Sequence, residues 1–253
     1  MAKKIIIGNW KMNPATRKDA MAIFSEVASG VKHFKKVSVV VCVPAVFLES
    51  INNLKLNSVS LGAENCFFDE MGPYTGEVSP LQLKNLGVQY VIVGHSERRV
   101  LGEDDELISK KIKSAVKAGL KIVFCVGERF RDEAGEYLNF LRNEITAGLS
   151  KIKREDLRSL IIAYEPVWAV GKNASGYPTP ESVLEVALFL KKILVEMFGR
   201  DYSFKVPIVY GGSVDKNNTD AMLRLSGVDG LLVGRDSLSS EKFLMVIAVA
   251  NSI

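Results

Sequence analysis

Five polar residues stand just after short apolar runs of this sequence, and together they could carry proton-transfer chemistry. Asn9 and Lys11 follow the first run. His95 and Glu97 follow the fourth, and Glu165 follows the sixth. Carboxylates and imidazoles are the groups that most often move protons in enzymes, and a nearby cation stabilises negative charge that develops during a reaction. This chemistry requires a fold that brings the five side chains to one place.

Two glycine-containing turns follow the last two apolar runs, at residues 211–213 and 234–235. Glycine lets the backbone approach an anion closely, and turns after the last strands of a barrel commonly form a phosphate site. The sequence therefore also contains a candidate anion site. For Gly211 and Gly212 alone, ordinary tight turns are the alternative interpretation.

The elements that must position these residues alternate regularly. Eight short, almost uniformly apolar runs are expected to form parallel strands covered on both faces: residues 5–7, 37–43, 59–63, 90–93, 122–126, 160–163, 208–210 and 230–233. A segment with helical spacing follows each run, as at residues 19–31, 105–117, 136–150, 181–198 and 240–250. Helix-start signals occur at residues 14–16, 79–80 and 179–181.

Eight strand–helix units within about 250 residues predict an α/β fold, a single closed (β/α)8 barrel that forms one catalytic domain over residues 1–253. An open doubly wound sheet is the alternative. That fold usually has a glycine-rich dinucleotide turn after its first strand, whereas this sequence has Gly8-Asn9-Trp10-Lys11 there. Because functional residues of a barrel lie at the carboxyl ends of its strands, the five polar residues are expected to meet at one mouth.

The composition argues against several classes of protein. Of the 253 residues, 47% are hydrophobic, which supports a sizeable core. The net charge of +4 comes from interleaved cations and anions, unlike the basic tracts of nucleic-acid-binding proteins. The three cysteines are odd in number and lack CxxC spacing, which favours reduced thiols in a cytoplasmic protein. No apolar run is long enough for a signal peptide or a membrane span.

Four motifs give the sequence a specific resemblance. They are Gly-Asn-Trp-Lys-Met-Asn at 8–13, Val-Gly-His-Ser-Glu-Arg-Arg at 93–99, Ala-Tyr-Glu-Pro-Val-Trp-Ala at 163–169 and Tyr-Gly-Gly-Ser-Val at 210–214. In type and order they resemble the signatures of the triosephosphate isomerase family. The resemblance implies a TIM barrel and an isomerase of glycolysis and gluconeogenesis, without cofactor or metal, that interconverts dihydroxyacetone phosphate and D-glyceraldehyde 3-phosphate through an enediolate. Another phosphate-binding barrel isomerase and a non-catalytic relative are the alternatives.

The resemblance implies a role for each polar residue at a strand end. It makes Glu165 the base and His95 a neutral imidazole that donates a hydrogen bond to the substrate oxygens. This family is itself a standard example of pKa tuning, and the two assignments are taken from it. Lys11 and Asn9 would stabilise the enediolate, and Glu97 would orient Lys11. The alternatives are structural roles: a solvated glutamate, a core histidine, and an ion pair between Lys11 and Glu97 that serves only the fold.

The resemblance also places the substrate phosphate on the backbone of Gly171, Ser213, Gly234 and Arg235. Two features depart from the family pattern. The run at residues 171–180, in the family's mobile loop, is two residues longer than usual, and Arg235 stands where the family usually has glycine. If position 235 required a positive φ, arginine would cost about 1–2 kcal/mol. We expect its side chain to point to solvent.

A partner surface is implied by the resemblance alone. Residues 65–77 resemble the family's long third loop, which docks into a neighbouring subunit near the residue after the lysine, here Met12. We therefore expect a homodimer in which Thr75 reaches the partner's active site. A loop packed on its own barrel is the alternative. The other expected partner is a phosphorylated triose, with no role for nucleic acid or membrane.

Overall fold

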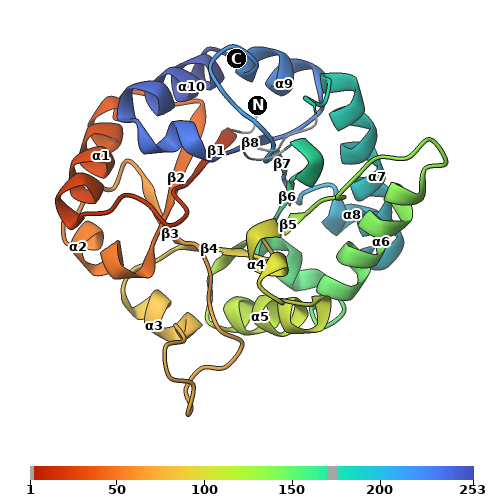
Figure 1. Cartoon of the computed structure of the whole chain (residues 1–253), viewed down its shortest axis with the longest axis horizontal. Coiled ribbons are helices and arrows are strands. Elements are labelled where there is room, and N and C mark those ends of the chain that lie inside the picture. The colour runs from red at the N-terminus through yellow and green to blue at the C-terminus, as the bar shows by residue number, and fades with distance from the viewer. Residues whose placement is uncertain (1–2, 170–175) are drawn as a thin grey trace.

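The strands close into a barrel in the computed structural model, which describes residues 3–169 and 176–253 (Figure 1). Strands adjacent in sequence pair in parallel, and the last strand pairs back with the first. The strands are β1 (Lys4–Asn9), β2 (Val37–Val43), β3 (Ser60–Ala63), β4 (Tyr90–Val93), β5 (Lys121–Val126), β6 (Leu160–Tyr164), β7 (Ile208–Tyr210) and β8 (Gly230–Val233). The predicted (β/α)8 barrel is confirmed.

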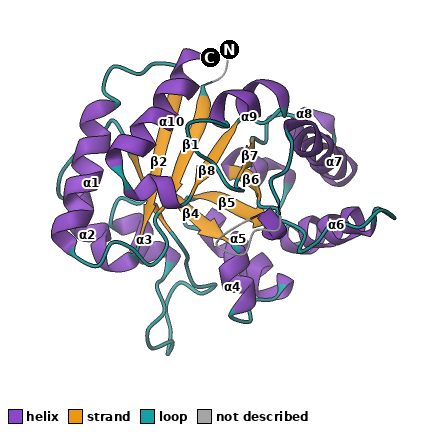
Figure 2. Ribbon diagram, turned by 45° about the horizontal axis from the view of Figure 1, so that its top comes forward, coloured by secondary structure: helices purple, strands orange, loops and turns teal. Residues whose placement is uncertain are grey.

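Helices surround the strands on the outside of the barrel (Figure 2). The α-helices of the described residues are α1 (Arg17–Gly30), α2 (Leu48–Asn52), α3 (Pro80–Asn85), α4 (Ser96–Val100), α5 (Asp105–Lys117), α6 (Glu136–Gly148), α7 (Pro180–Phe198), α8 (Arg200–Ser203), α9 (Thr219–Leu225) and α10 (Ser240–Ser252). Short 3-10 helices accompany them: η1 (Ala45–Phe47), η2 (Arg154–Ser159), η3 (Val167–Ala169) and η4 (Arg235–Leu238). Within the described ranges, no helix is long and apolar enough to cross a membrane.

Side-chain caps explain where three helices begin. The side chain of Thr16 accepts a hydrogen bond from the backbone of Asp19 at the start of α1. Ser79 forms a capping box with Gln82 before α3, and Thr179 caps α7. Each cap satisfies a backbone N–H that has no partner inside its helix. The predicted helix starts are therefore confirmed, with a mechanism for each.

Apolar side chains fill both faces of the barrel wall. The larger cluster lies between the strands and the helices, and the smaller one, which includes Ile7, Val40, Ile92, Cys125 and Leu232, fills the barrel itself. A closed parallel sheet buries both of its faces, which is why its strands are almost uniformly apolar. All three cysteines are buried with free thiols, as expected. The filled interior leaves the mouth of the barrel as the place for chemistry.

Candidate active site

The polar residues at the strand ends meet at one mouth of the barrel. A cavity of about 1040 Å³ opens there. Its lining includes Asn9 and Lys11 at the end of β1, His95 after β4, Glu165 after β6, Ser213 after β7, and Gly234 and Arg235 after β8. Because parallel strands all point their carboxyl ends to the same side, residues from distant parts of the sequence come together here.

Glu165 and His95 face each other in the floor of this cavity. Oε1 of Glu165 lies 3.3 Å from Nε2 of His95, and both side chains are less than 10% exposed. The backbone N–H of Glu165 donates to the carbonyl of Val126, which ties the end of β6 to the end of β5. The other carboxylate oxygen, Oε2, is buried without a hydrogen-bond partner among the described residues. A buried carboxylate oxygen without a donor is well placed to take a proton from a ligand.

His95 caps the N-terminus of α4 with its own ring. Nδ1 accepts a hydrogen bond of 3.2 Å from the backbone N–H of Glu97. An N–H donor requires a lone pair on Nδ1, so this contact favours a neutral imidazole whose proton is on Nε2. That proton faces the cavity and Glu165. The local geometry therefore agrees with the neutral histidine that the sequence resemblance implies.

Lys11 brings a positive charge to the same cavity. Its Nζ lies 2.6 Å from Oε1 of Glu97, which confirms the expected ion pair. The backbone of Lys11 has φ of 56°, in the left-handed region, and its N–H donates to the side-chain oxygen of Asn9. A β-carbon built at Gly234 would lie 3.8 Å from Cε of Lys11. The lysine side chain thus runs between Glu97 and the turn after β8.

The turn after β7 joins the candidate phosphate site to the residues that follow Glu165. The hydroxyl of Ser213 donates to the carbonyl of Ala169 in η3 (2.9 Å), and Asn218 donates to the carbonyl of Ser213 (2.8 Å). Gly211 lies against the side chain of Glu165, because a β-carbon there would be 2.8 Å from Cγ of Glu165. Close approach therefore explains this glycine better than the ordinary tight turn considered above.

Arg235 does not strain the turn after β8. It is exposed at the start of η4, on the rim of the cavity, and its φ is not positive. The predicted exposure is confirmed, and the penalty for a left-handed arginine does not arise. Gly171, expected to bind the same phosphate, lies outside the described residues, as do residues 172–175 of the lengthened run after it.

Comparison with known proteins decides the family. The sequence model of the family described as "Triosephosphate isomerase" matches residues 4–250 of the chain. The chain belongs to the triosephosphate isomerase family. Among its relatives is the triosephosphate isomerase of Carboxydothermus hydrogenoformans, 41% identical over 250 residues and 98% of each chain. That of Fusobacterium nucleatum is 38% identical over 254 residues, which cover 99% of this chain and all of the relative.

A solved structure supports the same placement. The crystal structure of triosephosphate isomerase from Bartonella henselae superposes with a TM-score of 0.85, covers 98% of both chains, and is 34% identical in sequence. The four motifs and the barrel of this chain thus agree with the triosephosphate isomerase family over nearly its whole length.

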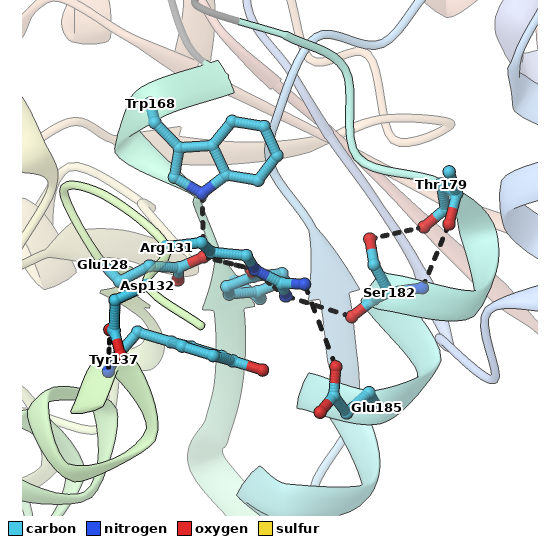
Figure 3. A network of polar contacts seen from close by, with 9 residues as sticks. Glu128, Arg131, Asp132, Tyr137, Trp168, Thr179, Ser182 and Glu185 are labelled. Atoms are coloured by element: carbon cyan, nitrogen blue, oxygen red, sulfur yellow. Dashed lines mark hydrogen bonds and ion pairs between the residues drawn. The ribbon is translucent and has the colours of Figure 1, made fainter. Parts of the chain in front are cut away.

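The sequence analysis did not predict a polar network of this triosephosphate isomerase fold that holds the first residues after Glu165 (Figure 3). Oε1 of Glu128 accepts hydrogen bonds from Nε1 of Trp168 (2.8 Å) and from the hydroxyl of Tyr164 (2.8 Å). Arg131 lies 3.2 Å from the same oxygen and donates to the carbonyl of Ser182 in α7. Glu128 comes two residues after β5, so the rule that singled out the other strand-end residues would have found it.

Glu64, directly after β3, was also missed. Its Oε1 is buried without a hydrogen-bond partner among the described residues. Burial raises the pKa of Glu64 from 4.5 to about 8. The backbone N–H of Lys11 opposes this shift, while the carboxylate of Glu97 adds to it. A carboxyl that interacts with Lys11 and Glu97 is therefore largely protonated at neutral pH.

Residues 65–77, the loop expected to reach a partner, project away from the barrel below α3 in Figure 1. The loop has its own aromatic cluster, in which the rings of Phe67 and Phe68 lie 4.2 Å apart and those of Phe67 and Tyr74 lie 4.5 Å apart. Met71 in this loop and Met12, next to Lys11 in the sequence, are 86% and 94% exposed. Two large apolar side chains are thus left without cover in the single chain.

Proposed function

We propose that this chain is an enzyme that interconverts dihydroxyacetone phosphate and D-glyceraldehyde 3-phosphate through an enediolate, as an isomerase of glycolysis and gluconeogenesis. The observation that carries the proposal is the contact of 3.3 Å between Glu165 and His95, with Lys11 in the same cavity, in a chain of the triosephosphate isomerase family. This combination of base, imidazole and cation is what proton transfer beside a carbonyl needs.

In the proposed mechanism, Glu165 removes a proton from the carbon beside the substrate carbonyl. Nε2–H of the neutral His95 donates to the substrate oxygens and moves the hydroxyl proton between them. Lys11 and Asn9 stabilise the negative charge of the enediolate, and Glu97 holds Lys11 in place through its ion pair. Glu165 then returns its proton to the neighbouring carbon, so the enzyme is unchanged at the end of the reaction.

The phosphate of the substrate would lie on backbone N–H groups of Gly171, Ser213, Gly234 and Arg235. The stem of Lys11 beside Gly234 supports this arrangement, because it carries the ammonium close to that turn. The bond from Ser213 to Ala169 supports a link between the phosphate side and the segment after Glu165. The side chain of Arg235 is exposed, so we assign this role to its backbone.

The test is an isomerase assay coupled to the consumption of the product, with glyceraldehyde 3-phosphate as substrate. Glu165→Ala should lower kcat by at least about 10³-fold, since it removes the group that transfers the proton. Glu133→Ala, at an exposed loop position, is the matched control and should retain wild-type activity. A loss of less than about tenfold in Glu165→Ala would show that another group is the base.

We also propose a cytoplasmic homodimer in which residues 65–77 dock near Met12 of a second copy and Thr75 reaches that copy's active site. The exposed Met12 and Met71 support an apolar contact, and the aromatic cluster of the loop supports a preformed shape. The three buried, free thiols support a reducing compartment. Size-exclusion chromatography with light scattering measures the assembly, and a monomer at micromolar concentration would contradict the dimer.

A further inference from the structure

A buried ion pair lies on the outer side of the barrel wall, behind the active site. Nε of Arg99, in α4, lies 3.2 Å from Oε1 of Glu144, in α6. The two side chains are 16% and 4% exposed, and neither lines the active-site cavity. The mechanism proposed above does not use this pair. Burying two charges is expensive unless they form good contacts, so such a pair needs an explanation.

Each member of the pair also holds the backbone at the end of a strand. Nε of Arg99 donates to the carbonyl of Gly94 (3.0 Å), the residue that links β4 to His95. Oε2 of Glu144 accepts a hydrogen bond from the backbone N–H of Gly127 (2.9 Å), the first residue after β5. The pair therefore connects the two segments that follow neighbouring strands.

Gly127 in turn packs on the backbone of the proposed base. A β-carbon built at Gly127 would lie 1.7 Å from the carbonyl oxygen of Glu165, so only glycine allows this approach. The N–H of Glu165 donates to Val126, directly before Gly127. A chain of direct contacts thus runs from His95 through Gly94, Arg99, Glu144 and Gly127 to Glu165.

We propose that the Arg99–Glu144 pair sets the relative position of His95 and Glu165, so that both are positioning residues for the reaction. This inference rests on the proposed function, because it assigns the pair a role in the same proton transfers. In such transfers, a displacement of about 1 Å can cost about 10²-fold in rate. Two charged groups with fixed hydrogen bonds hold a backbone more rigidly than neutral ones do.

The surroundings of Glu144 make this role depend on pH. Burial raises the pKa of Glu144 from 4.5 to about 7, with Arg99 and the N–H of Gly127 opposing the shift. The carboxylates of Asp105, which bonds Arg99 at 2.6 Å, and of Glu128 also face it and add to the shift. As pH falls through about 7, Glu144 takes up a proton and loses its attraction to Arg99.

The test compares Glu144→Gln with the wild type in steady-state kinetics. Glutamine keeps the shape and an acceptor for Gly127, but it removes the charge that faces Arg99. At about pH 8, kcat should fall by about tenfold to 100-fold, while KM changes little because the phosphate turns lie on β7 and β8. The matched control is Glu196→Gln, which breaks the exposed 2.6 Å ion pair between α7 and Arg142 of α6. That control should keep wild-type kcat.

The pH profile separates positioning from a structural role. The ratio of wild-type kcat to Glu144→Gln kcat should shrink toward one as pH falls below about 7, because the wild-type glutamate is then neutral as well. The titration of the substrate phosphate, with a pKa of about 6, is common to both proteins and cancels in the ratio. An unchanged kcat, a ratio that does not vary with pH, or an equal loss in Glu196→Gln would overturn the proposal.

A binding experiment distinguishes failure of the positioning proposal from failure of the proposed function. If the wild type has no isomerase activity, the proposed function is wrong whatever the variants do. If it is active, Glu144→Gln should bind a phosphorylated hydroxamate, a planar mimic of the enediolate, about tenfold more weakly, and should bind inorganic phosphate as the wild type does. Equal weakening of both ligands would indicate general loosening of the barrel and would reject the positioning role.

Discussion

Glu64→Gln should stabilise this protein, by an amount that grows with pH. Glu64 has a buried carboxylate oxygen without a hydrogen-bond partner among the described residues, and burial raises its pKa from 4.5 to about 8. The folded state therefore disfavours the ionised side chain that the unfolded chain carries at neutral pH. Glutamine has nearly the same shape and does not ionise, so it avoids this cost.

The size of the stabilisation follows from the pKa of Glu64 in the unfolded chain, 4.5, and in the folded protein, about 8. Each pH unit between them costs about 1.4 kcal/mol of stability, because the unfolded chain loses a proton that the folded chain keeps. Below about pH 4.5 both states are protonated, and the cost is absent. At pH 7 it amounts to about 3 kcal/mol, and above pH 8 it levels off at about 5 kcal/mol. For a chain of this size, the pH 7 value corresponds to a rise in Tm of about 6–12 °C.

Thermal unfolding followed by circular dichroism measures this at about pH 5, 7 and 8.5, at equal protein concentration. The difference in Tm between Glu64→Gln and wild type should be small at the lowest pH and largest at the highest. Glu133→Gln, at an exposed loop position, serves as the control and should leave Tm unchanged throughout. A variant that is less stable than wild type at about pH 8.5, or a gain that does not vary with pH, would refute the reasoning.

Two further predictions concern single side chains. Arg235→Gly should leave kcat and KM within about twofold of wild type in the isomerase assay, because the side chain is exposed and its φ is not positive; a large rise in KM would show that the guanidinium grips the phosphate. Lys111→Met should lower the free energy of unfolding, measured in urea, by about 3–5 kcal/mol. The substitution removes the ammonium that lies 2.6 Å from Oε1 of the buried Glu103 and leaves that carboxylate without this partner. A loss below about 1 kcal/mol would show that Arg98, also paired with Glu103, suffices.

The barrel could be predicted from the sequence because its strands are buried on both faces. Runs such as residues 37–43 and 90–93 are apolar throughout and end abruptly, so their bounds match β2 and β4. The first apolar run predicts a strand at residues 5–7, but β1 continues to Asn9 because Gly8 and Asn9 still pair with β2. The expected helix at 136–150 ends two residues earlier, at Gly148. The bounds of the apolar strands β2 and β4 were thus placed more accurately than the end of this helix.

The site could be predicted only where one rule applied, that polar residues at strand ends meet at the mouth of a barrel. That rule brought together Lys11, His95 and Glu165, and it would have included Glu64 and Glu128 had it been applied to β3 and β5. Which side chains contact each other could not be predicted from the sequence. The bond between Glu128 and Trp168 joins residues 40 positions apart, and its existence depends on how β5 and β6 lie side by side.

The left-handed backbone of Lys11 has a consequence for how this chain can change over evolutionary time. A lysine with φ of 56° is strained by roughly 1 kcal/mol relative to an ordinary conformation, and glycine at this position would relieve that strain. Selection for stability alone would therefore remove the residue that supplies the cation of the cavity. Under the proposed function, catalysis is what retains this lysine at a cost in stability, so a descendant that no longer catalyses the reaction should lose this side chain early.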